Sequence, residues 1–150
     1  MVRLIRSGCV VTMMLAAATP VIAGQSSPAG HVKTVTGSAY IVRQNATLPA
    51  RAGEAVFAGD SLRTAADGTV GVTLMDDTRI SLGPSSEVRV ARYVYAPGEG
   101  GLGMVLSFVR GVGAYVSGRM AKLAPDSIRL ETPSAIVGVR GTTVAIRVDP

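Results

Sequence analysis

Short runs of alternating apolar and polar residues dominate the chain after residue 30 and leave few folds open to it. At residues 70–74 the first, third and fifth residues are aliphatic and share one face of an extended strand. Ile80 and Leu82 repeat the pattern on the next run. The link at residues 75–78 has the length of a hairpin loop, and its aspartates tolerate the left-handed backbone that such loops often need. The sequence therefore predicts an all-β fold.

Further strands are expected wherever the alternation recurs between glycine, proline and aspartate residues. They lie at residues 69–74, 79–82, 88–94, 104–110, 113–116, 128–130, 135–139 and 142–148, and two more flank a tight bend at Gly37. A helix is expected only at residues 118–123, as one turn at most. Many short strands with turn residues between them are typical of a compact β-roll or sandwich, which is the predicted architecture.

The first 23 residues are not expected to belong to that domain. Arg3 and Arg6 precede an apolar run at residues 9–18, and Pro20 and a small-residue pattern ending at Ala23 follow it. This order is that of a secretory signal peptide. Because the apolar run is shorter than the roughly 20 residues that a spanning helix needs, an uncleaved membrane anchor is the less favoured alternative.

Cleavage after Ala23 would leave residues 24–29 as a flexible start and residues 30–150 as one β domain. That domain would lie in the periplasm or outside the cell, with no membrane span. Cys9, the only cysteine, would leave with the signal peptide. A disulfide or a cysteine nucleophile is therefore not expected in the mature domain.

The charge pattern does not favour nucleic acid as a partner. The chain has 15 basic and 10 acidic residues, a net charge of +5, and two of the basic residues belong to the expected signal peptide. The other basic residues are scattered singly, and aromatic residues make up only 4% of the chain. A groove for nucleic acid needs a cluster of both kinds.

Catalysis, metal binding and cofactor binding are poorly supported. His31, the only histidine, lies near the expected flexible start, where it is badly placed for a catalytic triad or a metal centre. The acidic residues lack the close, fixed spacing of a calcium loop and instead fit turns; they are Asp60, Asp67, Asp76, Asp77 and Glu87. A carboxylate pair for glycoside hydrolysis is formally possible, but the chain has no tryptophan to hold a sugar ring. We therefore expect no enzyme activity and no cofactor.

Five sequence blocks stand out in order along the chain, at residues 30–37, 59–64, 67–70, 77–86 and 132–142. Together they resemble the FecR domain, the extracytoplasmic domain of iron-signalling regulators of the ferric-citrate type. The most specific block is the last, Thr-Pro-Ser-Ala-Ile-Val-Gly-Val-Arg-Gly-Thr. The resemblance implies a periplasmic module that acts in envelope signalling by binding another protein. The anti-sigma segment and membrane helix of full regulators have no counterpart in the sequence, so we expect a stand-alone exported domain, and the resemblance does not carry the sigma-factor role over to it.

The candidate partner-binding residues are Tyr93, Tyr95 and Arg140. The two tyrosines would share one face of a strand, and tyrosines are favoured at binding surfaces, although they could equally close the edge of the core. Arg140 could present a fork of donors to a carboxylate or phosphate. It could also hold loop carbonyls or an acid such as Asp60, and this second interpretation is the one that we favour.

The block at residues 132–142 is expected to be structural first. Its apolar run suits a central strand buried on both faces, with Pro133 flanking it. Gly138 would let a neighbouring strand approach, and Gly141 would take a positive φ so that residues 144–148 pair back. The other turn or motif residues of the family blocks are Gly59, Asp60, Asp67, Gly68, Gly83 and Thr142.

The sequence thus predicts an exported, non-catalytic module for binding or sensing, with an envelope protein as its partner. The alternative is a module that binds an envelope glycan or another polysaccharide. The absence of tryptophan counts against that alternative.

Overall fold

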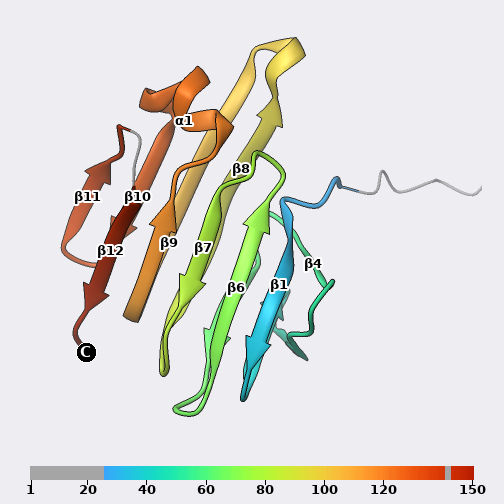
Figure 1. Cartoon of the computed structure of the whole chain (residues 1–150), viewed down its shortest axis with the longest axis vertical. Coiled ribbons are helices and arrows are strands. Elements are labelled where there is room, and N and C mark those ends of the chain that lie inside the picture. The colour runs from blue at the N-terminus through green and yellow to red at the C-terminus, as the bar shows by residue number, and fades with distance from the viewer. Residues whose placement is uncertain (1–25, 141–142) are drawn as a thin grey trace, which may run out of the picture.

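The computed structural model describes residues 26–140 and 143–150, and these residues form an all-β fold, as predicted (Figure 1). One short helix, α1 (Arg119–Leu123), occupies the only stretch where a helical turn was expected, and two 3-10 turns, η1 (Pro97–Glu99) and η2 (Pro125–Ser127), accompany it. None of the helices in this part of the chain is long and apolar enough to cross a membrane. The strands are β1 (Gly30–Thr36), β2 (Ala39–Arg43), β3 (Ala46–Pro49), β4 (Ala55–Val56), β5 (Ser61–Thr64), β6 (Thr69–Leu74), β7 (Arg79–Leu82), β8 (Glu87–Ala96), β9 (Gly101–Val116), β10 (Ile128–Thr132), β11 (Ala135–Gly138) and β12 (Thr143–Val148).

Strand β9 is shared by two sheets that enclose one core. Its first part lies between β8 and β10, in a sheet with the order β3-β2-β5-β8-β9-β10-β11. Its last part, from Gly111 on, lies between β7 and β12, in a sheet with the order β4-β1-β6-β7-β9-β12. Neighbouring strands are antiparallel except β9 and β10, which run parallel. In Figure 1, β1, β6, β7 and β9 of the second sheet run side by side, with β12 beyond β9.

Gly111 is a bend inside β9, whereas the sequence suggested a turn between two separate strands. Its φ of +83° is one that glycine adopts without strain. A Cβ at this position would collide with the hydroxyl of Ser86 and the carbonyl oxygen of Ser85. Glycine therefore lets one strand pass from the first sheet into the second.

The predicted hairpin of β6 and β7 is confirmed. Val70 lies opposite Leu82 and Val72 opposite Ile80, and all four side chains are buried. Asp77 in the connecting loop has a φ of +66°, the left-handed conformation expected of it. The alternation of apolar residues therefore determines both the faces and the register of this pair.

The core is built from the inward residues of both sheets and from α1. Burial of each large apolar side chain contributes roughly 1.5–3 kcal/mol, so a dozen of them make a core without disulfides. The largest fully buried side chains are Tyr115, Phe108, Ile41, Leu62, Ile80, Met104, Leu106, Met120, Ile128, Leu130, Val32 and Val56.

Three strands were missed because they lack a clear pattern or are very short. Strand β3 is almost entirely exposed, and β4 has only two residues. Strand β5 alternates between half-buried and buried residues, but it spans only four residues. Tertiary pairing, rather than local sequence, forms these elements.

The prediction of a central, doubly buried strand at residues 135–139 is wrong. Strand β11 pairs only with β10, and all four of its residues are exposed. No described atom lies within 4 Å of the place that a Cβ on Gly138 would take, so the pairing with β10 does not require a glycine there. Residues 144–148 pair with β9 and not with β11. Pro133 does flank a strand, in the turn between β10 and β11, and Gly141 and Thr142 lie outside the described residues.

Ala29, just before β1, packs onto the β fold. Ala29 is 2% exposed. Its N–H donates to the carbonyl of Val56 at 2.7 Å, and its carbonyl accepts from the N–H of Met75 at 2.9 Å. The expected signal peptide lies outside the described residues.

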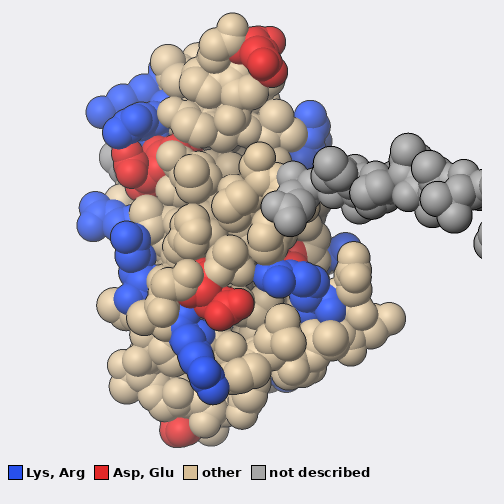
Figure 2. Space-filling model, turned by 90° about the vertical axis from the view of Figure 1, so that its right-hand side faces the viewer, with Lys and Arg blue, Asp and Glu red and all other residues tan. Residues whose placement is uncertain are grey.

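Charged side chains are spread over the surface in small groups. On the face shown in Figure 2, separate basic groups lie among neutral residues, with acidic groups between them. The closest exposed pair, Arg119 and Asp77, has an N–O distance of 2.9 Å. A surface of this kind agrees with the scattered charges of the sequence.

Candidate functional site

A largely apolar groove of about 690 Å³ lies beside the C-terminal part of β8. Tyr93 and Tyr95 line it from β8, and Met75 lines it from the loop between β6 and β7. Met75 is 51% exposed, whereas the tyrosines are partly buried and pack against the core. The rest of the lining is Ser26, Ser27, Pro28, Ala58, Val94 and Ala96.

A β-bulge at Ala91 turns the tyrosines toward the groove. Up to Val90, the even-numbered residues of β8 face the core. The register with β9 shifts between Val90 and Arg92, so that from there on the odd-numbered residues face inward. Tyr93 then lies opposite the buried Met104. Arg92, between the bulge and Tyr93, is exposed.

The groove borders an edge of β8 that no described strand covers. Strand β5 pairs only with the first three residues of β8. Two more backbone bonds follow, from Gly59 N–H to the carbonyl of Val90 at 2.6 Å and from Val90 N–H to the carbonyl of Asp60 at 2.9 Å. Beyond Val90, β8 pairs only with β9, on its other side.

The hydroxyl of Tyr93 is used by the fold. It accepts from the N–H of Asp76 and donates to Oδ1 of the same residue, both at 3.0 Å. Burial, and then the charge of Asp76, raise the pKa of Tyr93 well above its ordinary value. Tyr93 therefore offers its ring to the groove, while its hydroxyl holds the ring in place.

Asp76 joins three elements around this tyrosine. Its side chain is completely buried. Besides the bond from Tyr93, its carboxylate accepts bonds from the hydroxyl of Thr78 at 2.7 Å, the N–H of Thr78 at 3.3 Å and the N–H of Met120 at 3.3 Å. Its carbonyl accepts from Arg119 N–H at 2.7 Å. Asp76 thus ties the β6–β7 loop to β8 and to α1, which is the structural role that turn residues were expected to have.

Tyr95 differs from Tyr93 in that its hydroxyl makes no hydrogen bond to any described residue. It lies opposite Leu102 at the start of β9, close to the tip of the β8–β9 hairpin. Among the predicted site residues it is the one whose ring and hydroxyl both remain available to a ligand.

Arg140 lies away from the tyrosines. It follows β11 and lines a separate cavity of about 410 Å³, which shares no residue with the tyrosine groove. Its nearest acid is Asp126, at 3.8 Å, and both side chains are more than 85% exposed. The three residues that the sequence singled out are therefore not brought together.

Asp60, named as one acid that Arg140 could hold, is instead paired with Arg43. The guanidinium of Arg43 bonds both carboxylate oxygens, with Nε 3.0 Å from Oδ1 and Nη2 2.7 Å from Oδ2. It also donates to the carbonyl of Ala55 and lies 4.6 Å from the ring centre of Phe57. Hydrogen bonding to the Asp60 carboxylate raises the pKa of Arg43. Asp60 is 2% exposed and the Arg43 side chain 29%, so a buried carboxylate is held by a partly exposed guanidinium.

Alanine substitutions of Arg43 and Arg140 should differ in their effect on stability. Arg43→Ala leaves the buried Asp60 carboxylate without its cation and is expected to lower the free energy of unfolding by about 2–3 kcal/mol. Arg140→Ala removes only an exposed pair and should change it by less than about 0.5 kcal/mol. Urea denaturation of both variants checks this. Equal losses in the two variants would contradict the pairing described above.

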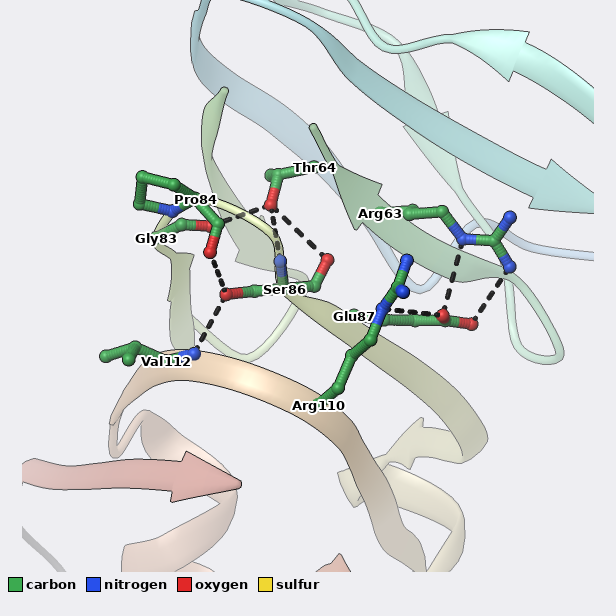
Figure 3. Close-up of polar contacts among 8 residues, drawn as sticks. All are labelled: Arg63, Thr64, Gly83, Pro84, Ser86, Glu87, Arg110 and Val112. Carbon is green, nitrogen blue, oxygen red and sulfur yellow. Dashed lines mark hydrogen bonds and ion pairs between the residues drawn. The ribbon is translucent and has the colours of Figure 1, made fainter. Parts of the chain in front are cut away.

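The family motifs meet where β9 bends between the sheets (Figure 3). The hydroxyl of Thr64 donates to the carbonyl of Gly83 at 2.7 Å and accepts from Ser86 N–H at 2.9 Å. The hydroxyl of Ser86 in turn donates to the carbonyl of Pro84 at 2.9 Å and accepts from Val112 N–H at 2.8 Å. These bonds pin the turn before β8 onto the bend of β9, so the motif residues serve the fold.

A surface ion cluster flanks this joint. The carboxylate of Glu87 lies 3.3 Å from Arg63 on β5 and 3.7 Å from Arg110 on β9. The glutamate is 15% exposed and the arginines 41% and 50%. The cluster therefore links three neighbouring strands on the outer face (Figure 3).

The remaining motif glycines are placed as follows. Gly59 has a φ of +93° in the turn before Asp60. Gly68 passes so close to the carbonyl of Ser38 that a Cβ would collide with it, and Asp67 accepts from the hydroxyl of Ser38 at 3.3 Å. Gly138 ends β11 and is not in a turn.

Sequence reasoning missed Arg43, Thr64, Thr78 and Ser86 as the partners of these motif residues. Arg43 is 17 residues from Asp60, and Thr64 is 22 from Ser86. Nothing local in the sequence signals these two pairs, because only strand pairing brings their members together. Thr78 differs, since it lies two residues from Asp76, and an aspartate that bonds the backbone two residues on is a local turn signal. Within the described ranges, no three His, Cys, Asp or Glu side chains gather into a possible metal site.

Comparison with known proteins gives one family match. A family model described as FecR protein matches residues 60–150, which is more than half of the chain. Neither a curated protein nor a solved structure matches the chain. The match covers every motif described above except the block at residues 30–37 and the start of the block at 59–64.

Proposed function

Since the chain belongs to the FecR family, we propose that it is an exported, non-catalytic module that binds an envelope protein through the groove beside β8. Domains of this family are regulatory signalling domains and not enzymes. Family membership thus supports a role in signalling, and the groove supplies a place where a partner would be recognised.

The observation that carries this proposal is the combination of aromatic rings with an uncovered strand edge. Tyr93 and Tyr95 offer two rigid rings, and tyrosine is enriched at protein interfaces because it adds contact area at a low entropic cost. The edge of β8 beyond Val90 leaves backbone groups for an extended segment to pair with. Since Asp76 fixes the ring of Tyr93, the groove is already formed before a partner arrives.

Site-specific photo-crosslinking tests the proposal. A photoreactive phenylalanine analogue replaces Tyr95 in the full chain in cells, and the matched control carries it at Val109, which is 43% exposed and lies outside the groove. The expected result is a discrete protein adduct from position 95 and none from position 109. Adducts are then identified by mass spectrometry.

Two results would overturn the proposal. Adducts that contain carbohydrate and no protein would favour a glycan-binding module instead. No adduct at position 95, with the chain folded and abundant, would remove the groove as a partner site.

Export itself is tested by N-terminal sequencing of the protein from the cell envelope fraction. The arrangement of Arg3, Arg6, the apolar run and Ala23 leads us to expect an N-terminus at Gly24. A matched variant with Ala23→Arg should accumulate uncleaved, since signal peptidase requires a small residue there. A protein that retains Met1 in the membrane fraction would contradict cleavage.

A further inference from the structure

Two arginines lie in one row on the outer face of the first sheet. Arg92 on β8 and Arg129 on β10 both pair with Val105 of β9, the strand between them. Val105 stands between the buried Met104 and Leu106, so it points away from the core, and residues paired across a sheet point to the same face. The two arginine side chains therefore leave the sheet on one face, two strand spacings or about 10 Å apart.

Gly103 lets the guanidinium of Arg92 lie over β9. Cζ of Arg92 is 3.4 Å from the place that a Cβ on Gly103 would take, and Nε and Nη2 are each 3.5 Å from it. Gly103 is buried although it has no side chain of its own. Because β9 separates β8 from β10, a guanidinium above β9 is directed toward Arg129. A larger residue at position 103 would push it away from this place.

The two arginines line one small cavity of about 210 Å³. This volume is below the roughly 300–1,000 Å³ of pockets that enclose a whole small molecule, so the cavity fits a single chemical group. Ser127 of η2 also lines it and brings a hydroxyl. The rest of the lining is Leu102, Gly103, Met104, Val105 and Asp126.

No acid neutralises these two guanidiniums. Neither of them makes a hydrogen bond or an ion pair with a described residue. Asp126 borders the cavity, but its side chain is 88% exposed and its ion-pair partner is Arg140, at 3.8 Å. Glu131 lies two residues further along β10 and accepts a bond from the hydroxyl of Ser107 at 3.2 Å. The cavity therefore has two positive charges without a counter-ion among the described residues.

We propose that Arg92 and Arg129 bind a phosphate group in this cavity, with the hydroxyl of Ser127 as a further donor. A phosphate group has oxygens on several sides, so it accepts bonds from guanidiniums on both sides of β9 at once. A carboxylate has two oxygens in one plane, and a single guanidinium satisfies both. The cavity shares no residue with the tyrosine groove, so the inference does not depend on the proposed function.

Titration of inorganic phosphate into the purified, isotope-labelled protein at constant ionic strength tests free phosphate as the ligand. The Nε–H signals of Arg92 and Arg129 in NMR spectra should shift together and saturate. Acetate, the comparison anion, should bind about tenfold more weakly or less, because it engages one guanidinium only.

Vesicle co-sedimentation tests a lipid headgroup as the source of the phosphate. Vesicles of phosphatidylcholine with phosphatidylglycerol are compared with vesicles of phosphatidylcholine alone. Binding that requires phosphatidylglycerol identifies a lipid headgroup, and binding of inorganic phosphate without binding to vesicles identifies a free phosphate. Either result supports the site, provided that it depends on both arginines.

Three variants establish that dependence. Arg92→Gln and Arg129→Gln should each weaken binding about tenfold or more, because each removes charge-assisted hydrogen bonds. Arg79→Gln is the control, since Arg79 is also exposed and has no ion pair with a described residue, but lies on β7 in the second sheet. It should bind like the parent protein, and all three variants should keep the parent's circular dichroism spectrum because their side chains are exposed.

Three results would overturn the proposal. The first is that neither inorganic phosphate nor phosphatidylglycerol vesicles bind. The second is an equal loss of binding in Arg79→Gln, which would show a general effect of net charge. The third is that acetate binds as tightly as phosphate, which would remove the assignment of the cavity to a phosphate group.

Discussion

Replacing Asp76 by alanine is expected to lower the free energy of unfolding by about 3–5 kcal/mol. The carboxylate is fully buried and accepts bonds from the hydroxyls of Tyr93 and Thr78 and from two backbone N–H groups. With alanine at this position, these donors would lose their acceptor in a buried space that is closed to water. Each unsatisfied buried group costs roughly 1–3 kcal/mol, and part of the loss is recovered as the loop relaxes.

Urea denaturation gives the measurement, and the neighbouring residue supplies the control. Asp77 is 60% exposed and sits at a φ of +66°, so Asp77→Asn keeps a residue that tolerates this backbone and removes only a surface ion pair with Arg119. That variant should lose less than about 1 kcal/mol. If Asp76→Ala and Asp77→Asn unfold at the same urea concentration, Asp76 does not hold the loop, β8 and α1 together.

Replacing Gly111 by alanine should lower the free energy of unfolding by about 3 kcal/mol or more. The positive φ alone strains an alanine by roughly 1–3 kcal/mol. The added methyl group would also meet the hydroxyl of Ser86, which holds the bend of β9 through its bond to Val112 N–H. Steric overlap in a packed region adds roughly 1–3 kcal/mol more.

Gly98→Ala is the matched control. Gly98 lies in η1, has no atom within 4 Å of the place that a Cβ would take, and does not have a positive φ. Its substitution should change stability by less than about 1 kcal/mol. Thermal and urea unfolding of the two variants, compared with the parent protein, decide the matter. A Gly111→Ala protein as stable as Gly98→Ala would mean that β9 bends without help from glycine.

Strands that bury only one face could be predicted from the sequence, because their apolar residues alternate with polar ones. The β6–β7 hairpin was foreseen in full, because Val70, Val72, Ile80 and Leu82 alternate with polar residues. At residues 135–138 the apolar run was continuous, and such a run is compatible with a strand buried on both faces or with an exposed edge. Only the position of β11 beside β10 distinguishes the two.

The candidate site was predictable in part. The sequence placed Tyr93 and Tyr95 on one face of a strand, and the structure brings both into one groove. It could not foresee the bulge at Ala91 that directs them inward, since a shift in register is a property of the pairing with β9. Nor could it connect Tyr93 to Asp76, which is 17 residues away.

Strand β9 has a consequence for the dynamics of the domain, because it runs through the middle of both sheets. Neither sheet can open fully while the other stays intact, since each would lose its central strand. The amide hydrogens of β9 should therefore exchange with solvent only when the whole domain unfolds, and they should be the slowest in the molecule. Local fluctuations are left to the outer strands. The tyrosine groove and β11, which lie on opposite sides of β9, thus keep a constant spacing and orientation for as long as the domain stays folded.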